Sequence, residues 1–347
     1  MQVDTGPLLT AVENQRVGCM LAGSDLYASA LSAVAADITS GGPSLRILTP
    51  VADAPFGDAV LLRMLAAVHD LVLDGLAPEL AAHYPSAGGT PGPGLVDDFL
   101  ATLLRYELQI TEAMGRGVQT NEVGRSVALL GGWLTLARHG LPLRVLEIGA
   151  SAGLNLRLDR YRYEHAHFAF GPIGSAVRFQ DPFVGAITPD GTIPLVVSER
   201  RGCDLEPIDP TTADGQRRLR SLVWPDQPER RARLDAAMAE AERVPVAIDR
   251  ADAVDWLRSQ LAEPVPGVIT VVMHSITFQY LSPSARSELL AVIDQAGARA
   301  TSQAPFAWLR TEPGGPQAET RLTEYPGGTP RLLATSSYHG PPVAWLS

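Results

Sequence analysis

Residues 144–159 read RVLEIGASAGLNLRLD, and this stretch decides the fold. A short apolar run, residues 145–148, stops at Gly149, which is typical of a buried parallel strand. The small residues 149–153 predict a turn, and the leucine-rich residues 154–158 predict the start of a helix. Small side chains let a ligand approach the main chain closely, and the N–H groups that open a helix point toward it. This order of strand, turn and helix holds a nucleotide at the carboxyl end of a parallel sheet.

The details of the turn favour one kind of nucleotide. A dinucleotide site needs G-x-G-x-x-G, whose second glycine gives room to a pyrophosphate. Here Ser151 takes that place between Gly149 and Gly153, and Glu147 puts a carboxylate at the strand end. This carboxylate repels a pyrophosphate and suits a cationic ligand. The pattern E-x-G-x-x-x-G resembles motif I of the class I S-adenosylmethionine-dependent methyltransferases; the alternative is an ordinary strand and turn without a ligand.

Composition limits the classes of protein. At 347 residues the chain has room for two domains, and 46% apolar with 19% charged residues is ordinary for a globular protein. A formal charge of −10 argues against general binding to nucleic acid or anionic membrane, although a local basic groove remains possible in principle. Two cysteines are too few for a disulfide framework. Without a signal sequence or a membrane-length apolar run, a cytoplasmic protein is expected, and the oligomeric state stays open.

The N-terminal part is predicted to be helical. Helical periodicity marks residues 8–36, 58–73 and 95–114, and a loop rich in glycine and proline spans 84–94. We therefore expect a helical domain over residues 1–139 that covers the site and selects the substrate. Residues 140–347 are expected to form the α/β domain.

A polar cluster begins the last helix before the sheet, over residues 118–132. Thr120 or Asn121 is the expected N-cap. Because this helix leads into the first strand, its start is expected near the ligand, where the substrate candidates are Gln119, Asn121, Glu122 and Arg125. The alternative for these residues is capping and exposure to solvent.

Two further groups of residues carry alternatives. Alternation after Arg160 predicts a short hairpin that places His165 and His167 on one strand face. Two histidines can bind metal, but no Cys, Asp or Glu cluster accompanies them, so no metal site is expected. The arginines of the helical residues 211–243 form either a solvated face or a surface that attracts an anionic substrate.

The methyltransferase resemblance implies roles for residues at successive strand ends. In motif I the implied cofactor-binding residues are Glu147, Gly149, Ser151, Gly153 and Asn155. After a second strand at 195–197, Asp204 resembles the acidic residue that binds the ribose hydroxyls, with Glu199 as the competing candidate. After a third strand at 244–248, Asp252 and Ala253 lie where this superfamily contacts adenine.

The fourth strand, within residues 268–282, ends in polar residues where the superfamily faces the transferred methyl group. The resemblance implies His274 or Tyr280 as a base, and Ser275 and Gln279 as substrate contacts. A hydrogen-bonded structural role is the alternative for His274. A fifth strand at 305–312 and a hairpin of 319–325 with 331–337 are expected to complete the sheet.

These motifs follow the order of the class I methyltransferases over residues 140–347. LEIGASAGLNL and RRGCDLEPID also resemble an uncharacterised bacterial family with a domain of unknown function. The implied fold is a Rossmann-like, mostly parallel sheet with a closing antiparallel hairpin, and the implied cofactor is S-adenosylmethionine. The Ala-Ser-Ala turn, a long insertion after motif I and the lack of an N/D-P-P-Y motif leave the small-molecule acceptor open. The alternatives are a catalytically inactive binding or regulatory relative and, third, a nicotinamide-dependent oxidoreductase.

Overall fold

The computed structural model describes residues 4–51, 59–185 and 189–346. The chain forms two compact units, and each combines two stretches of sequence. The first comprises Met1–Thr120 and Thr212–Ala232, and the second comprises Asn121–Thr211 and Arg233–Ser347. This division differs from the predicted boundary between residues 139 and 140, because residues 121–139 pack with the sheet and residues 212–232 pack with the first unit.

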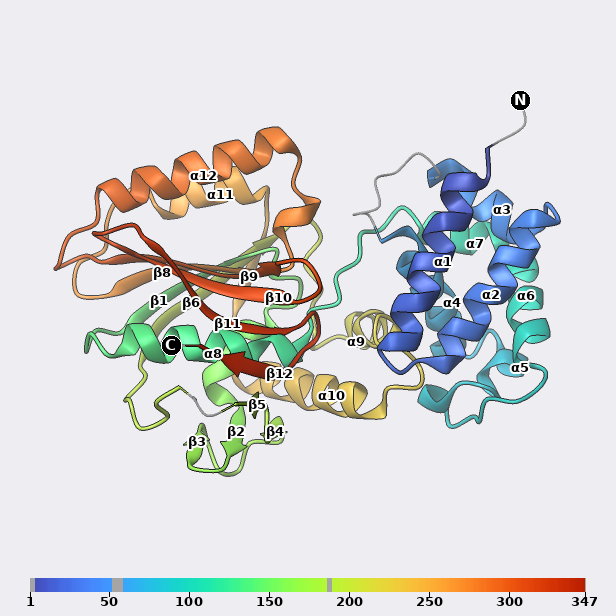
Figure 1. Cartoon of the computed structure of the whole chain (residues 1–347), viewed down its shortest axis with the longest axis horizontal. Coiled ribbons are helices and arrows are strands. Elements are labelled where there is room, and N and C mark those ends of the chain that lie inside the picture. The colour runs from blue at the N-terminus through green and yellow to red at the C-terminus, as the bar shows by residue number, and fades with distance from the viewer. Residues whose placement is uncertain (1–3, 52–58, 186–188, 347) are drawn as a thin grey trace. The chain divides into compact units, whose positions relative to one another are not determined.

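The first unit consists of helices in its described residues (Figure 1). Their apolar faces enclose one core, which includes Tyr27, Met64 and Phe99. The predicted helix 95–114 is two helices that meet at Tyr106, and the predicted start at Asp58 lies outside the described residues. The elements are α1 (Gly6–Leu21), α2 (Asp25–Thr39), α3 (Pro43–Leu48), η1 (Thr49–Val51), α4 (Val60–Leu73), α5 (Pro78–Ala81), η3 (Pro85–Ala87), α6 (Leu95–Arg105), α7 (Glu107–Ala113) and α9 (Ala213–Ser221).

Charge pairs and a buried histidine attach α9 to α4 within this unit. Arg217 donates from Nε to Asp70, at 3.0 Å, and forms ion pairs with Asp74 and Asp214. His69 on α4 lies within hydrogen-bond distance of the Ser221 carbonyl oxygen, at 3.1 Å. Burial lowers the pKa of His69 to about 3, so its ring is neutral at physiological pH. These contacts explain why residues 212–232 belong with the helices that precede the sheet in sequence.

The second unit is built on a nine-stranded, mostly parallel sheet, which confirms the mixed α/β class (Figure 1). The strand order is β5-β12-β11-β10-β9-β8-β1-β6-β7. The strands are β1 (Leu143–Ile148), β5 (Phe183–Val184), β6 (Val197–Asp204), β7 (Ala247–Arg250), β8 (Ile269–Ser275), β9 (Phe306–Pro313), β10 (Ala318–Tyr325), β11 (Pro330–Ser337) and β12 (Gly340–Trp345).

The parallel part of the sheet has the strand order that places a ligand site. In chain order its five strands run third, second, first, fourth, fifth, so the order reverses between β1 and β8. Every residue of β1 is buried, because the strand pairs on both edges and is covered on both faces. In open α/β sheets, ligands bind outside the carboxyl ends of the strands at such a reversal.

The antiparallel part extends the sheet beyond β9. The hairpin of β10 and β11 was predicted, but β12 and β5 were not. Pro341 and Pro342 hide β12 in the sequence, since proline removes a ladder donor. A separate small sheet of β2 (Arg162–His165), β3 (Phe168–Phe170) and β4 (Arg178–Gln180) includes the predicted hairpin after Arg160.

Three predicted boundaries of the second unit are corrected by the structure. The second strand runs from Val197 to Asp204 rather than over 195–197, because its charged residues face partners on neighbouring strands. The segment after the glycine turn is a 3₁₀-helix, η5 (Leu154–Arg160), rather than an α-helix. The helix before the sheet begins as η4 (Val123–Arg125) and continues as α8 (Ser126–Ala137), so neither Thr120 nor Asn121 is its N-cap.

Helices cover both faces of the large sheet (Figure 1). One face carries α11 (Ala253–Gln260) and α12 (Pro283–Ala298), and the other carries α8. α10 (Pro228–Arg243) and η6 (Phe278–Tyr280) complete the elements. The backbone of α8 comes close to the sheet at two glycines: a Cβ on Gly131 would lie 2.2 Å from the Trp345 ring, and one on Gly132 would lie 2.5 Å from Leu309.

No helix in the described part of the chain is both long and apolar enough to cross a membrane.

We predict that Gly131→Ala destabilises the sheet unit. Its Cβ would overlap the buried Trp345 ring, and such overpacking costs about 1–3 kcal/mol of unfolding free energy. Gly174→Ala is the control, because a Cβ there has no atom within 4 Å, and a change below about 0.5 kcal/mol is expected. Calorimetric unfolding of both variants checks this, and equal transition shifts for the two would contradict the packing described for α8.

Candidate functional site

The candidate site lies at the carboxyl ends of β1, β6 and β8, where the turn of residues 149–153 follows β1. The main-chain N–H groups of this turn are hydrogen bonded inside the protein. Ser151 N donates to the Asp204 carboxylate at 2.9 Å. Ala152 N and Leu154 N both donate to Asn121 Oδ1, at 3.2 and 3.0 Å. The turn is therefore held in one conformation by two side chains, one from the end of β6 and one from the segment before α8.

Several residues at this edge have left-handed backbone conformations. Ser151 has φ 54°, Asn121 has φ 38° and Ile276, just after β8, has φ 51°. A β-branched residue is rarely found there, and such strained residues concentrate at functional sites. Gly149, with φ 63°, leaves no space for a side chain, because its Cβ would lie 2.6 Å from Thr277.

Glu147, the residue before the last of β1, carries a buried carboxyl group. It is 2% exposed, and its Oε2 has no hydrogen-bond partner among the described residues. Its pKa is raised to about 8, chiefly by burial and also by the Asp204 carboxylate, against the opposing effect of Arg157 and Arg125. The Oδ1 atom of the buried Asn155 also has no partner within the described residues. Within the described residues, the site thus contains two buried oxygen atoms that accept no hydrogen bond, which native proteins rarely leave unexplained.

The structure separates the two candidates for a ribose-binding carboxylate. Asp204 ends β6 beside the turn and accepts hydrogen bonds from Ser151 N and from Glu206 N, the latter at 3.0 Å. Glu199 lies near the beginning of β6 and is ion paired with Arg144, at 2.8 Å. It is therefore toward the amino end of the strand, away from the turn. Asp204 is the candidate that this site can use.

Asp252 has a local role in the chain. Its carboxylate accepts hydrogen bonds from Val254 N, at 2.8 Å, and Asp255 N, at 3.2 Å, as the N-cap of α11. Ala253 is the first residue of that helix. The predicted adenine contacts thus lie at the start of α11, after the third parallel strand, and their role toward a ligand stays a prediction.

The polar cluster before α8 is divided between the units. Asn121, Glu122 and Arg125 belong to the sheet unit, whereas Gln119 belongs to the helical unit and accepts a hydrogen bond from Arg218 there. Glu122 Oε1 accepts from Gly124 N at 3.0 Å, and its main-chain oxygen accepts from Asn155 Nδ2 at 3.3 Å. The cluster is therefore mostly structural support for the turn.

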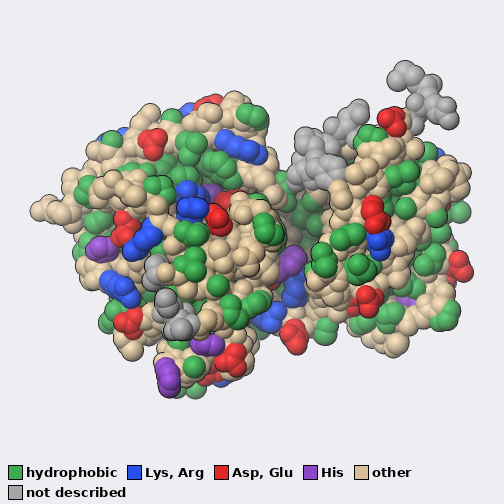
Figure 2. All heavy atoms as spheres, in the orientation of Figure 1, with side chains coloured by type: hydrophobic (Ala, Val, Ile, Leu, Met, Phe, Trp, Pro, Cys, Tyr) green, Lys and Arg blue, Asp and Glu red, His purple; other side chains and the backbone are tan. Residues whose placement is uncertain are grey.

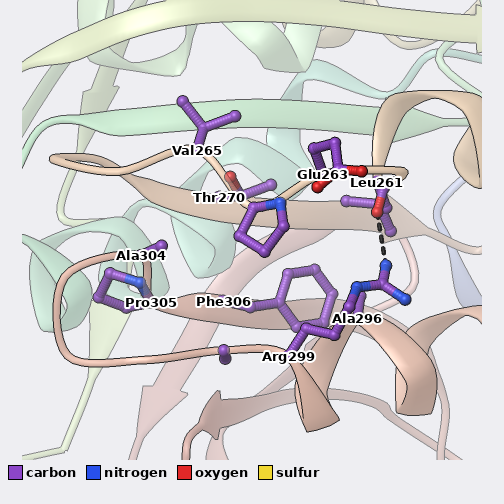
Figure 3. A pocket seen from close by; sticks show the side chains of 11 residues that line it. Leu261, Glu263, Val265, Thr270, Ala296, Arg299, Ala304, Pro305 and Phe306 are labelled. Carbon is purple, nitrogen blue, oxygen red and sulfur yellow. Dashed lines mark hydrogen bonds between the residues drawn. The ribbon is translucent and has the colours of Figure 1, made fainter.

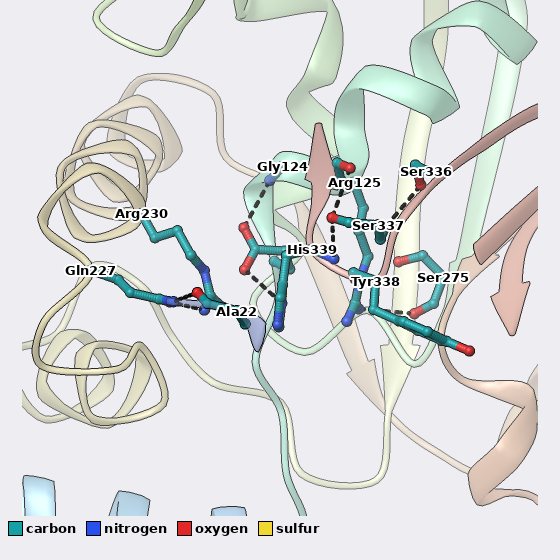
Figure 4. Close-up of polar contacts among 12 residues, drawn as sticks. Ala22, Gly124, Arg125, Gln227, Arg230, Ser275, Ser336, Ser337, Tyr338 and His339 are labelled. Carbon is teal, nitrogen blue, oxygen red and sulfur yellow. Dashed lines mark hydrogen bonds and ion pairs between the residues drawn. The ribbon is translucent and has the colours of Figure 1, made fainter. Parts of the chain in front are cut away.

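Arg125 connects three elements at the site. Its Nε donates to the Tyr338 carbonyl oxygen at 3.0 Å, and its Nη1 donates to the Ser275 carbonyl oxygen at 3.3 Å (Figure 4). His339, in the same turn as Tyr338, faces Glu122 at 3.7 Å (Figure 4). These contacts bring the turn between β11 and β12 to the carboxyl end of β8.

His274 lies on the opposite face of the sheet from Glu147. Met273 is the cross-strand neighbour of Glu147, and successive residues of a strand point to opposite faces. Trp308 Nε1 donates to His274 Nε2 at 3.0 Å, so the proton of the neutral ring is on Nδ1, which donates to Glu312 Oε1 at 2.6 Å. Both ring nitrogens are therefore engaged, and this geometry favours the structural alternative over a base.

The other residues predicted at the end of β8 lie along the following segment. Ser275 ends β8, and its carbonyl oxygen accepts from Arg125. Gln279 and Tyr280 lie on η6, where the Gln279 carbonyl oxygen accepts from Arg286 Nη2 at 2.9 Å. The Tyr280 side chain is 43% exposed. Of the two predicted bases, His274 is buried and Tyr280 is exposed. Tyr280 is therefore the one that solvent and a substrate can reach, and its role as a base stays a prediction.

Sequence reasoning missed Glu312 and Thr277. Glu312 Oε1 accepts from His274 and also from Thr277 N, at 2.9 Å, which fixes the segment after β8. Burial opposes the ionisation of Glu312. The hydrogen bonds that it accepts from His274 and from the main-chain amides of Thr277 and Phe278 nevertheless hold its pKa below the ordinary value. No local pattern marks Glu312, because it reaches the site through the pairing of β9 with β8.

Other parts of the sheet unit show fewer features of a binding site. On the face shown in Figure 2, basic and acidic side chains are interspersed. Among the described residues, no three His, Cys, Asp or Glu side chains form a group that could hold a metal ion. A shallow pocket near Thr270 and Phe306 lies at the amino ends of β8 and β9, where Arg299 donates to the Leu261 carbonyl oxygen at 2.6 Å (Figure 3). That is the end of the strands away from the candidate site.

Comparison with protein families identifies one match, a family described as "Uncharacterized protein conserved in bacteria (DUF2332)", over residues 10–345. The chain belongs to the DUF2332 family. The matched residues include most of both units. Comparisons of this DUF2332 protein with curated proteins and with solved structures give no significant match.

We predict that Glu147 makes stability depend on pH. Its pKa is raised in the folded state, so the folded chain binds a proton that the unfolded chain releases between pH 4.5 and about 8. Relative to Glu147→Gln, the wild type should keep its stability below pH 4.5 and lose about 1.4 kcal/mol of unfolding free energy per pH unit within that window. Denaturant unfolding of both proteins across pH 4–9 measures this, and a constant difference would contradict the buried, protonated carboxyl.

Proposed function

We propose that this protein is an S-adenosylmethionine-dependent methyltransferase that acts on a small molecule. One observation carries the proposal: Glu147, next to the end of β1, and Asp204, at the end of the adjacent parallel strand β6, lie beside the turn of residues 149–153, and the strand order reverses at the other edge of β1. This is the place in an open α/β sheet where nucleotides bind. The order of the acidic residues along the chain matches the motif order of the class I methyltransferases.

The residues present fit the cofactor. The buried Oε2 of Glu147 and Oδ1 of Asn155 accept no hydrogen bond from the part of the chain that the structure describes, and the amino group of S-adenosylmethionine is a donor with positive charge. The carboxylate of Asp204, held in position by two main-chain amides, suits the two hydroxyls of a ribose. When bound, S-adenosylmethionine would supply a methyl carbon open to in-line attack by an acceptor atom, with S-adenosylhomocysteine as the leaving group.

The contribution of this chain to such a reaction is mainly binding and orientation, because methyl transfer from a sulfonium depends on proximity and a dry site. The strained, internally bonded turn holds the binding groups in place before the ligand arrives. A base for the acceptor is assigned to Tyr280 in preference to His274, whose ring nitrogens both have partners. The acceptor itself and the methylated atom are not specified by these residues.

A non-catalytic role is the second candidate, and the state of His274 favours it. His274, which the resemblance implies as a base, is hydrogen bonded to Glu312 and Trp308. The main-chain amides of the turn donate to the side chains of Asn121 and Asp204. A relative that retained the fold as a binding or regulatory protein would bind an adenosyl ligand without turnover. The third candidate, a nicotinamide-dependent oxidoreductase, fits less well, because a pyrophosphate would meet the Glu147 carboxyl beside Ser151.

We predict that the purified protein binds S-adenosylhomocysteine and that Asp204→Asn weakens this binding by about tenfold or more, since hydrogen bonds to a charged group contribute about 1.5–3 kcal/mol. Isothermal calorimetry measures the dissociation constants. Glu199→Gln is the matched control, because Glu199 is on the same strand but ion paired with Arg144 near its other end. This control should bind like the wild type.

The same titration with NAD separates the alternatives. Tighter binding of NAD than of S-adenosylhomocysteine would contradict the proposal, as would the absence of adenosyl binding by a protein whose circular dichroism shows it to be folded. Binding without methyl transfer to any of a panel of small-molecule acceptors would move the assignment to the non-catalytic candidate.

A further inference from the structure

A hollow in the helical unit lies between α4, α9 and the end of α7. α4 contributes residues at positions 63, 66, 67 and 70, whose spacing puts them on one face of the helix. α9 and the residue after it contribute Arg218, Ser221 and Leu222 with the same spacing. The hollow is completed by Ala113, Arg116 and Gly117. Alanine and glycine in two of these three segments, α4 and residues 113–117, keep the space open.

Positive charge dominates the lining of this hollow. Three arginines line it, Arg63, Arg116 and Arg218, and Asp70 is the one acid among the lining residues. Asp70 is ion paired with Arg217, which donates to it at 3.0 Å from outside the lining and also pairs with Asp74 and Asp214. A concentration of guanidinium groups is unexpected in a chain with a formal charge of −10, because an acidic protein has many carboxylates with which to pair them.

Arg63 has hydrogen-bonding capacity that the protein does not use. Its Nε atom is buried and has no hydrogen-bond partner among the described residues. A buried donor without a partner costs free energy unless a ligand or water provides an acceptor. Arg63 therefore lines the hollow and brings to it a guanidinium group with an unused donor.

The site is held in shape by contacts around it. The ion pairs of Arg217 with Asp70 and Asp74 fix α9 against α4, and Arg218 donates to the side-chain oxygen of Gln119. Ser221 is connected to α4 through His69. These contacts fix Arg218 and the packing of α9 on α4 before any ligand binds, which reduces the ordering needed on binding.

We propose that this hollow binds an oxyanion group, a phosphate or a carboxylate, of a small molecule. The planar guanidinium presents donors in a fork that matches both groups and remains charged at all physiological pH values. The cavity volume of the hollow is about 50 Å³, several times the roughly 10–15 Å³ that one water molecule needs, so a small oxyanion group has room there. The site lies within the helical unit, and its proposal does not depend on methyl transfer in the sheet unit.

Calorimetric titration of the full-length protein with inorganic phosphate, and separately with acetate, tests this site at low ionic strength. We expect saturable binding of at least one anion, and Arg63→Gln should weaken it by about tenfold or more. Arg63→Lys keeps the charge without the fork and should fall between the two. Arg105→Gln is the matched control, because Arg105 is an exposed arginine of the same unit whose guanidinium lies over the Tyr106 ring.

The pattern of outcomes decides the proposal. Loss of binding in Arg63→Gln with retention in Arg105→Gln supports it, and the anion that binds more tightly identifies the ligand group. Absence of saturable binding to either anion overturns it, as does equal weakening in both variants, which would indicate general charge attraction. If Arg63→Gln does not fold by circular dichroism, Arg116→Gln at the exposed rim takes its place with the same expectation.

Discussion

The turn between β1 and η5 carries several main-chain N–H groups into the interior of the protein, and each must find an acceptor there. This constraint brings distant parts of the sheet unit together. Asp204 supplies one acceptor from the end of β6, and Asn121 supplies another from the segment before α8. Asn121 has a left-handed backbone conformation, and in this conformation its side-chain oxygen accepts the hydrogen bonds from the turn. The arrangement of the candidate site follows from how these amides are paired.

Beside this turn, the buried Glu147 makes the site electrostatically unusual. A carboxyl group on a fully buried strand costs free energy when ionised, which explains its raised pKa. Arg157 and Arg125 lower the pKa, but their guanidinium groups are hydrogen bonded to main-chain oxygens rather than to this carboxyl group. The Oε2 atom of Glu147 thus lies near positive charge but accepts no hydrogen bond from the described residues. A ligand that donates a hydrogen bond to this atom would remove the cost of leaving it unpaired.

The sequence predicted those parts of the fold that local patterns encode. The apolar run at 145–148 predicted the buried strand β1, and the polar residues at the ends of β6 and β8 remain the predicted site. Pairing between strands was beyond its reach: His274 was expected to face the ligand, but Glu312 and Trp308 on β9 hold it on the other face of the sheet. The residues before α8 were expected to contact the substrate, but the structure shows Asn121 and Glu122 in hydrogen bonds with residues 152–155.

The return of residues 212–232 to the helical unit was equally hidden, because it depends on contacts between positions far apart in sequence. Arg217 reaches carboxylates on α4, and Trp224 enters the helical core beside Tyr27. Hydrogen exchange with mass spectrometry, with and without S-adenosylhomocysteine, tests the central claim most directly, since a bound ligand slows local opening of its site. The account predicts slower exchange in peptides covering residues 147–155 and 202–208. Unchanged exchange in both peptides at saturating ligand would contradict it.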